Sequence, residues 1–199
     1  MPTLILATQN AHKVEEFTAL LAPWTVIPLP DNVDLPPEVG ETFAENALEK
    51  ARTAAAATGR AAFADDSGIV ADALDGRPGV RSARFAGDDA SDEENLALFA
   101  EQVPAGSAIA YVCAIAYVDP RTRTEQIVEG RCTGTMAEGP RGDGGFGYDP
   151  IFIPDEQSAS GGSARRTMAE LTPAEKSAVS HRGHAARELR RALGLDDGA

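Results

Sequence analysis

The stretch Ala61-Ala62-Phe63-Ala64-Asp65-Asp66-Ser67-Gly68 ends an apolar run with two adjacent carboxylates, a hydroxyl and a glycine. The apolar residues predict a buried strand, and the carboxylates follow at its end. Successive strand residues face opposite sides, so Asp65 and Asp66 can point toward one site only if the chain turns, and Gly68 permits that turn. Two interpretations remain open: a divalent-metal or general-base site, and a loop aspartate that caps the next element.

The residues at the start of the chain predict a strand, a loop and a helix in direct succession. Residues 3–7 are apolar, and residues 11–21 carry apolar side chains at helical spacing. The loop 8–10 therefore lies at the carboxyl end of a strand and the amino end of a helix, where backbone N–H groups favour anions. Lys13 falls in the first helical turn and favours a phosphate contact there, with a solvated surface lysine as the alternative.

A second, longer helix is predicted at residues 43–58. Thr42 begins a capping box, the interior is rich in alanine, and Gly59 supplies the stop. One stripe of small residues suits close packing on a sheet. The stripe that carries Asn46 and Lys50 is either ordinary solvent surface or a functional face.

The rest of the chain continues the alternation of strands and helices. A helix at residues 91–103 is expected to be structural, and helix starts are also expected at residues 167 and 172. Further strands are expected at residues 24–29, 69–74, 107–118 and 124–136, the last two as a long antiparallel hairpin. These elements predict an α/β fold with a mixed central sheet flanked by helices, formed by residues 1–199 as a single domain. Residues 155–165 read as a Ser/Gly loop, to which we assign no function.

The composition limits the kinds of ligand that the protein can hold. The 199 residues carry a formal net charge of -13, which argues against broad electrostatic binding to nucleic acid. A polyanionic substrate would therefore need a few placed cations, backbone amides and a metal ion. Of the 18 basic residues only Lys13, Lys50 and Lys176 are lysine, and we interpret these three as positions that need a compact ammonium group, with chance as the alternative.

Cysteine usage and hydropathy indicate a soluble cytoplasmic protein. Cys113 and Cys132 lie in strand-like runs without metal-ligand spacing, so we expect reduced core thiols. His181 and His184 have no third soft ligand nearby in sequence, so zinc is not expected. We see no basic leader and no run near the ~18 apolar residues of a membrane span, so no membrane partner is expected.

A glycine-rich segment at residues 139–147 leads into Phe146-Gly147-Tyr148-Asp149-Pro150. An aromatic ring in a flexible glycine setting, followed by a carboxylate, can stack on a base and form a hydrogen bond with it. The alternative is an aromatic anchor of a hairpin. These residues alone leave both interpretations open.

Six motifs, taken in order, resemble the inosine triphosphate pyrophosphatase family, whose members hydrolyse non-canonical purine nucleoside triphosphates. The motifs span nearly the whole chain, and all three lysines fall inside them. They are Thr8-x-Asn10-x-x-Lys13; Glu38 with Thr42-Phe43-x-x-Asn46-Ala47-x-x-Lys50-Ala51; Ala64-Asp65-Asp66-Ser67-Gly68; Pro78-Gly79-x-x-Ser82-Ala83-Arg84; Gly144-Gly145-Phe146-Gly147-Tyr148-Asp149-Pro150; and Glu175-Lys176-x-x-x-Ser180-His181-Arg182-Gly183.

The resemblance implies a two-lobed fold around a long sheet, an active site in the cleft between the lobes, and a homodimer. It implies Mg²⁺-dependent cleavage of ITP, dITP or XTP to the monophosphate and pyrophosphate. Phosphates would be held by Thr8, Asn10, Lys13 and Lys50. The remaining substrate contacts would come from Ser67, Phe146, Gly147, Tyr148, Asp149, Lys176, His181 and Arg182, with Phe146 stacked on the purine.

The resemblance also implies that Glu38 and Asp66 hold the metal, with Asp66 as the proton acceptor. A carboxylate bound directly to Mg²⁺ is a poorer base, so Asp65 and Asp66 both remain candidates for the catalytic proton transfer, with Lys50 beside them. Two rival functions stay open. One is a Maf-like nucleotide pyrophosphatase with another base preference, and the other is a nucleotide-binding module without turnover.

Overall fold

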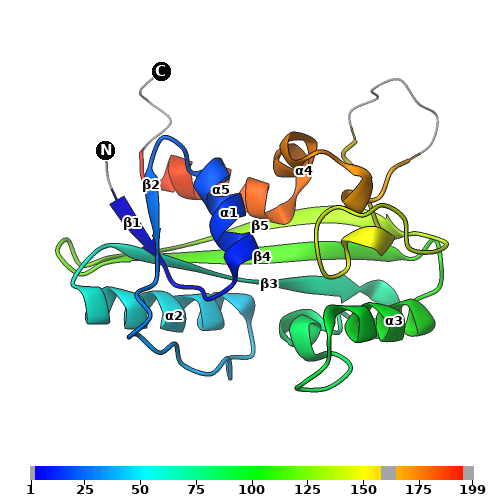
Figure 1. Ribbon diagram of the computed structural model, residues 1–199, viewed down its shortest axis with the longest axis horizontal. Coiled ribbons are helices and arrows are strands. Elements are labelled where there is room, and N and C mark those ends of the chain that lie inside the picture. Colours follow the sequence, from blue (N-terminus) through cyan, green and yellow to red (C-terminus); the bar gives the residue numbers. More distant parts are fainter. Residues whose placement is uncertain (1–2, 158–164, 195–199) are drawn as a thin grey trace. The chain divides into compact units, whose positions relative to one another are not determined.

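Six strands form one mixed sheet in the computed structural model, which describes residues 3–157 and 165–194 (Figure 1). The strands are β1 (Thr3–Leu6), β2 (Thr25–Pro28), β3 (Ala62–Ala71), β4 (Ala108–Asp119), β5 (Thr124–Met136) and β6 (Phe152–Pro154). Their order is β2-β1-β3-β4-β5-β6. Strand β1 pairs in parallel with β2 and β3, whereas β5 pairs antiparallel with β6. The predicted mixed sheet is therefore confirmed.

The helices begin and end close to where the sequence predicts, except that the helix start expected at residue 167 is only the short 3₁₀ turn Met168–Glu170. They are α1 (Ala11–Leu20), α2 (Phe43–Thr58), α3 (Asp92–Gln102), α4 (Pro173–Val179) and α5 (His181–Ala192). At the start of α2 the Thr42 hydroxyl accepts the Glu45 N–H, and the Glu45 carboxylate accepts the Thr42 N–H in return. Gly59 ends the helix with φ +64°, the left-handed conformation that glycine adopts without steric cost.

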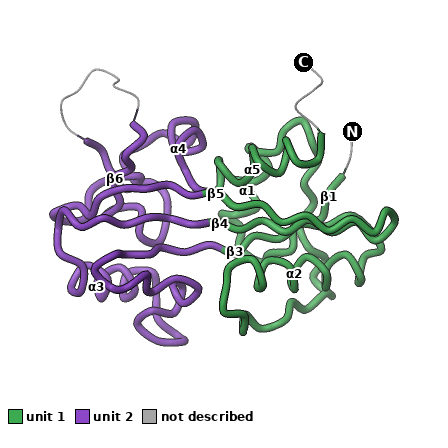
Figure 2. The backbone as a smooth tube through the Cα atoms, turned by 180° about the vertical axis from the view of Figure 1, so that it is seen from behind, with its two compact units in different colours: residues 1–66, 113–130, 182–199 green, residues 67–112, 131–181 purple. Residues whose placement is uncertain are grey.

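The chain forms two compact units, coloured separately in Figure 2. Unit 1 holds residues 1–66, 113–130 and 182–199, and unit 2 holds residues 67–112 and 131–181. Strands β3, β4 and β5 each contribute residues to both units. Each unit carries its own buried core.

In unit 1, the helices cover both faces of the strands (Figure 1). On one face, the alanines of α2 pack against strand side chains that all point to the α2 side. That cluster contains Ala47, Ala51, Ala54, Ile5, Ala62, Ala64, Ala114 and Ala116. The second face packs against α1 and α5, through Phe17, Ala185, Leu189, Leu4, Leu6, Phe63, Cys113 and Ile115. Strand alternation thus assigns each strand side chain to a particular helix.

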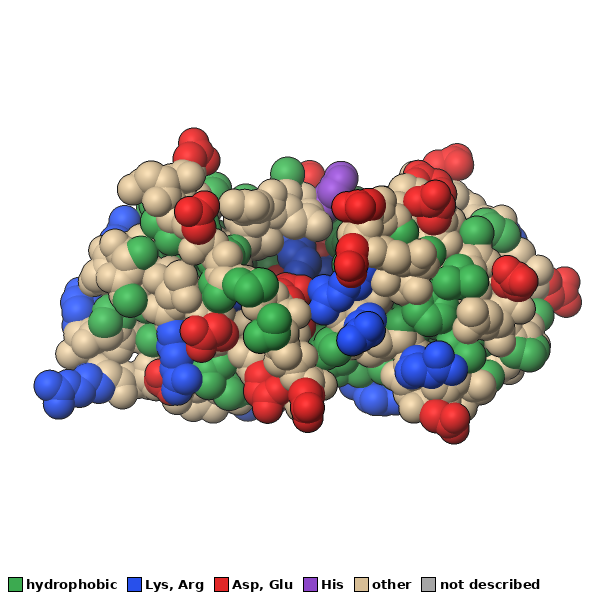
Figure 3. All heavy atoms as spheres, turned by 90° about the horizontal axis from the view of Figure 1, so that it is seen from below, with side chains coloured by type: hydrophobic (Ala, Val, Ile, Leu, Met, Phe, Trp, Pro, Cys, Tyr) green, Lys and Arg blue, Asp and Glu red, His purple; other side chains and the backbone are tan. Residues whose placement is uncertain are grey.

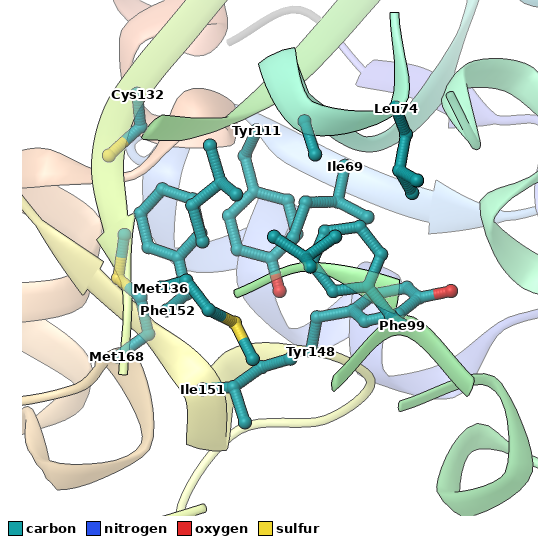
Figure 4. Close-up of a cluster of buried hydrophobic side chains, with 13 residues drawn as sticks. Ile69, Leu74, Phe99, Tyr111, Cys132, Met136, Tyr148, Ile151, Phe152 and Met168 are labelled. Carbon is teal, nitrogen blue, oxygen red and sulfur yellow. The ribbon is translucent and has the colours of Figure 1, made fainter. Parts of the chain in front are cut away.

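In unit 2, one apolar cluster joins strand residues to α3 and to the segment that follows β5 (Figure 4). The rings of Tyr111 and Phe152 stack with centroids 4.5 Å apart, and the ring of Phe99 meets Tyr148 edge to face at 5.2 Å. Aromatic pairs in these arrangements add attraction beyond the apolar area that they bury. The rings therefore fix α3 against the residues around Tyr148.

The predicted turn at Gly68 and the separate strand at residues 69–74 are wrong, because β3 continues without a break from Ala62 to Ala71. Gly68 is needed for space and not for a turn. A Cβ atom there would lie 2.4 Å from Ser82 Oγ and 2.5 Å from the carbonyl oxygen of Gly79. Of the predicted loop at residues 155–165, residues 158–164 lie outside the described part of the chain.

None of the helices in the part of the chain that the structure describes is both long enough and apolar enough to cross a membrane.

The two thiols, Cys113 and Cys132, are buried and free, as the sequence predicts. Acidic and basic side chains are mixed on the face drawn in Figure 3. A polyanion on that face would therefore depend on locally placed cations.

Candidate active site

The alternation of β3 places its two neighbouring carboxylates on opposite faces of the strand. Asp65 has the parity of Phe63, which packs on the side of α1 and α5, and Asp66 has the parity of Ala62 and Ala64, which pack under α2. Both carboxylates are buried. The prediction that a turn brings them toward one site is therefore wrong, and each has its own set of partners.

Asp65 is the centre of an ion-pair network on the α1 and α5 side. Its Oδ2 atom lies 3.0 Å from Lys13 Nζ and 3.5 Å from Arg182 Nε, and Arg182 Nη1 donates to Glu16 Oε2 at 3.2 Å. Burial alone would raise the pKa of the Asp65 carboxyl, but Lys13, Arg182 and Lys50 outweigh burial and hold the pKa below its usual range. Asp65 is thus an ionised counter-charge, which makes it a poor proton acceptor.

Asp66 has a different environment on the α2 side. Asn46 Nδ2 donates to Asp66 Oδ2 at 2.8 Å, and the carbonyl oxygen of the same amide accepts the Gly40 N–H at 2.8 Å. Burial raises the pKa of the Asp66 carboxyl; Lys50 opposes the shift, and Glu38 adds to it. A carboxylate with a raised pKa is a better proton acceptor near neutral pH, so this environment suits general-base chemistry.

Lys50 is buried between three carboxylates and is paired with one of them. Its Nζ atom donates to Glu38 Oε1 at 2.6 Å. Burial alone would lower the pKa of Lys50, but attraction to Asp65, Asp66 and Glu38 raises it, so the side chain carries a full positive charge. The polar stripe of α2 is therefore not ordinary solvent surface at Asn46 and Lys50, which are buried and paired, and its functional role stays a prediction.

The pair Glu38 and Asp66 fits a divalent cation. Among residues 3–157 and 165–194, no group of three or more His, Cys, Asp and Glu side chains could hold a metal ion. Mg²⁺, however, is usually bound by one or two carboxylates, with its other ligands from water and substrate phosphates. The negative charge of Glu38 contributes to the raised pKa of Asp66, and a cation bound between the two carboxylates would offset their repulsion.

The loop before α1 has the predicted position between a strand end and a helix start. The side-chain oxygen of Asn10 accepts the N–H groups of His12 at 2.9 Å and Lys13 at 3.3 Å, so Asn10 is the N-cap of α1. The Thr8 hydroxyl accepts the Asn10 N–H at 3.2 Å. The local bonds account for the loop conformation, and phosphate binding by Thr8 and Asn10 stays a prediction.

In unit 2, residues 144–149, here called the base loop, are organised by Asp149. Its Oδ2 atom accepts the Phe146 N–H at 3.0 Å and lies 2.8 Å from Lys176 Nζ, and its Oδ1 atom accepts the Tyr111 hydroxyl at 3.2 Å. Lys176 Nζ lies 4.9 Å from the centroid of the Phe146 ring. Phe146 is half-buried and Asp149 is buried, so the ring is held at the surface of the unit by a buried carboxylate.

Several predicted substrate contacts meet one another in unit 2, and Arg182 has its partners in unit 1. Phe146, Asp149 and Lys176 are in mutual contact, and His181 stacks on Tyr111 with centroids 4.6 Å apart. Arg182 belongs to unit 1, where its guanidinium is paired with carboxylates. Gly147 and Tyr148 continue the base loop, and Ser67 is half-buried in β3 two residues after Asp65.

Two residues of these networks were not predicted. Glu16 lies three positions after Lys13 on α1, a spacing that places both side chains on one helical face, so the sequence contained a signal for it. Tyr111 lies in a plain strand run and becomes noticeable only through its contacts with Asp149 and His181.

The fold and these side chains together define an α/β protein in which two carboxylates on the central strand β3 face lysines of the helices α1 and α2. The chain belongs to the Ham1 family, whose model matches residues 4–192. The dITP/XTP pyrophosphatase of Geobacillus kaustophilus is 46% identical over 198 residues, which cover 95% of this chain and 93% of the relative. That of Geobacter sulfurreducens is 46% identical and covers 98% of both chains.

Solved structures agree with this assignment. A HAM1 protein from Coxiella burnetii is 40% identical, with a TM-score of 0.82 over 98% of this chain and 99% of that one. The nucleoside-triphosphatase/dITP/XTP pyrophosphatase from Mycobacterium abscessus is also 40% identical, with a TM-score of 0.69 over 99% of this chain and 100% of that one. The family and fold class predicted from the six motifs are therefore confirmed.

Proposed function

We propose that this protein is a nucleoside triphosphate pyrophosphatase that cleaves ITP, dITP and XTP to the monophosphate and pyrophosphate, and so removes non-canonical purines from the nucleotide pool. The carrying observation is that the two buried carboxylates of β3, Asp65 and Asp66, lie with buried Lys50 and partly buried Lys13 and Glu38 around them. It occurs in a chain that is 46% identical to proteins named dITP/XTP pyrophosphatase.

The phosphates are bound by the cations of unit 1. A triphosphate carries about four negative charges at neutral pH, and each is attracted most strongly by ammonium groups in partly desolvated sites. Lys13 and Lys50 are such groups, with 16% and 8% of their side chains exposed. Asp65 acts on Lys13 as a positioning residue, because their 3.0 Å ion pair fixes the ammonium group at the start of α1.

Cleavage between the α and β phosphates requires a water in line with the leaving pyrophosphate and a group that takes its proton. We assign the proton to a carboxylate oxygen of Asp66, because burial and Glu38 raise its pKa, whereas the pKa of Asp65 is lowered. Lys50 offsets negative charge as it grows on the leaving group. Mg²⁺ would be held by Glu38 and by the Asp66 oxygen that does not take the proton; it would neutralise phosphate charge and lower the pKa of water, so that a weaker base suffices.

The purine stacks on Phe146 of the base loop, and Lys176 and Asp149 provide polar contacts at its edge. A site that donates hydrogen bonds to the 6-keto oxygen penalises adenine, because a 6-amino group leaves a buried donor without an acceptor. We assign this donation to His181, which stacks on Tyr111 in the same unit as Phe146. The 2-amino group of guanine is excluded by crowding or by an unmet donor in the same region.

A panel of nucleotides tests the proposal directly. Pyrophosphate release is measured from ITP, dITP, XTP, ATP, GTP, dTTP and UTP, with Mg²⁺ and with EDTA. We expect rapid release from the first three with Mg²⁺ and a loss of release in EDTA. Equal rates for ATP or GTP would refute the base preference, and a preference for pyrimidine nucleotides would favour the Maf-like alternative.

The variant Asp66→Asn separates catalysis from binding. We expect a loss of turnover by about 10²- to 10⁴-fold, the range for removal of a general base, with the far-ultraviolet circular dichroism unchanged. Nucleotide binding by the wild type without any pyrophosphate release would instead support a binding module. We also propose a homodimer, as the resemblance implies, which sedimentation equilibrium tests independently; a monomer at micromolar concentration would contradict it.

A further inference from the structure

Helix α3 carries two direct contacts to the base loop, although its sequence predicts only a structural role. The Gly147 N–H donates to Asp92 Oδ2 at 3.2 Å, across 55 residues of sequence. The ring of Phe99, which is fully buried, meets the ring of Tyr148 edge to face at 5.2 Å (Figure 4). The two residues that follow Phe146 are therefore both in contact with one helix.

A third connection runs through the 3₁₀ segment Gly79–Arg84 and the residues after it. Asn95 of α3 is only 2% exposed, and its side chain accepts the Ala86 N–H at 2.8 Å and donates to the Ala83 carbonyl at 3.1 Å. The Tyr148 hydroxyl donates to the carbonyl of Ser82 at 2.7 Å. Asn95 thus fixes to α3 the same segment that holds the tyrosine hydroxyl.

Helix α3 is itself well fixed at the end that reaches the base loop. Ser91 and Glu94 form a capping box in which the Ser91 hydroxyl accepts the Glu94 N–H at 3.2 Å and the Glu94 carboxylate accepts the Ser91 N–H at 2.7 Å. Asp92 is the first residue of the helix, directly after this cap. Its carboxylate therefore projects from a rigid point, whereas Gly147 lies in a glycine-rich segment at φ +59°.

We propose that Asp92 is a positioning residue for the base loop, through which α3 fixes the orientation of the Phe146 ring. The proposal rests on the proposed function in one respect, since it takes the Phe146 ring to be the purine platform. On one side of the loop the Phe146 N–H is fixed by Asp149, and on the other side the Gly147 N–H is fixed by Asp92. With both amides held, the ring is preorganised for stacking.

The expected effect of losing Asp92 follows from this arrangement. Without the acceptor the base loop samples more conformations, and part of the binding free energy is used to order it. Because base stacking acts equally on the bound substrate and the transition state, KM rises while kcat is preserved. The loss of one hydrogen bond corresponds to a rise in KM of about threefold to tenfold.

Four variants of the full chain test the proposal. Asp92→Ala removes the acceptor, and Asp92→Asn keeps an acceptor oxygen and is expected to restore wild-type behaviour. Glu93→Ala is the matched control, because it removes an acidic side chain from the same first turn of α3 and leaves Asp92 in place. Tyr148→Phe removes the hydroxyl that holds Ser82 and is expected to raise KM in the same direction as Asp92→Ala.

Two readouts are compared. The first is the kinetics with ITP, as KM and kcat, and the second is the rate of hydrogen exchange of the Gly147 amide, measured by NMR without nucleotide. We expect faster exchange and a raised KM in Asp92→Ala, and neither in Asp92→Asn or Glu93→Ala. Exchange and KM in Asp92→Ala that match Glu93→Ala would overturn the proposal. Should the wild type release no pyrophosphate, the proposed function fails, and the exchange rates still decide whether Asp92 positions the loop.

Discussion

Asp65 and Asp66 are neighbours on β3, yet Asp65 is paired with Lys13 at 3.0 Å on one face of the strand and Asp66 accepts a hydrogen bond from Asn46 at 2.8 Å on the other. The pKa values of the two carboxylates are consequently shifted in opposite directions: that of Asp65 lies below the usual range and that of Asp66 lies above it. This difference divides their roles, because one carboxylate supports the cations and the other is available to accept a proton.

Neutralising each carboxylate in turn separates stability from activity. We expect Asp65→Asn to lower the free energy of unfolding by about 3–5 kcal/mol, because it leaves Lys13 and Arg182 facing a buried site without their shared counter-charge. Asp66→Asn is expected to keep stability close to wild type while it lowers turnover by about 10²- to 10⁴-fold. Urea unfolding and pyrophosphate release, measured on both variants, check the pair; equal losses of stability would contradict the division.

Gly68→Ala is expected to destabilise the protein by about 1–3 kcal/mol, the usual cost of overpacking. The added methyl group would lie 2.5 Å from the carbonyl oxygen of Gly79, so backbone has to move. Gly139→Ala is the matched control, because a Cβ atom at that position meets nothing within 4 Å. Thermal unfolding of both variants makes the comparison, and a control that loses as much stability as Gly68→Ala would rule out the steric explanation.

The two thiols are expected to resist alkylation in the native protein. Burial raises the pKa of Cys113 far above its usual range and that of Cys132 to about 12, so almost no thiolate is present at pH 8. Iodoacetamide should modify both cysteines in urea and neither in buffer, as peptide mass spectrometry can show. Rapid modification of Cys132 in the native protein would mean that its burial is not maintained in solution.

Glu175 gives a stability contribution that depends on pH. The hydrogen bond from Arg166, together with the bonds from the Thr172 N–H and hydroxyl, lowers the pKa of Glu175 to about 2. Because its pKa is lower in the folded state, ionised Glu175 stabilises the fold at pH values above the unfolded-state pKa of about 4.3. This contribution disappears as the pH falls toward 2. The melting temperature of Glu175→Gln should therefore lie below that of the wild type at pH 6, and this gap should narrow below about pH 4.

Glu138→Gln serves as the control for that comparison, because it removes one exposed acidic charge of the same type. Its melting temperature is expected to follow that of the wild type across the pH range. A Glu175→Gln gap that stays constant from pH 6 to pH 3 would show that the charge of Glu175 is not what stabilises the start of α4.

Local patterns predicted most of the elements because local bonds make them. The capping boxes at Thr42, Ser91 and Thr172 lie at the starts of α2, α3 and α4, and apolar runs mark the strands. Gly68 misled the prediction, because glycine inside a strand reads as a breaker, whereas its reason is the approach of Ser82 from 14 residues away in the chain. Close approach of distant segments leaves no local pattern in a sequence.

The candidate site shows the same limit. Conspicuous residues such as Lys50 and Phe146 could be selected from composition and motif, and the structure gives them partners in the predicted regions. Their supporting contacts could not be predicted, since Glu16 meets Arg182 across 166 positions and Asp92 meets Gly147 across 55. Which face of β3 each carboxylate occupies also depends on the continuity of that strand, which the glycine concealed.

The unbroken alternation of β3 restricts how this segment can change in evolution. Deleting or inserting one residue between Ala62 and Asp65 would reverse the parity of everything that follows, so the carboxylates would exchange faces. Each carboxylate would then meet the partners of the other, and the apolar side chains that follow would be carried to the opposite helix layer. A change of two residues would restore the parity but would shift both carboxylates along the strand and away from Lys13 and Asn46, so point substitution is the main route of variation left to this segment.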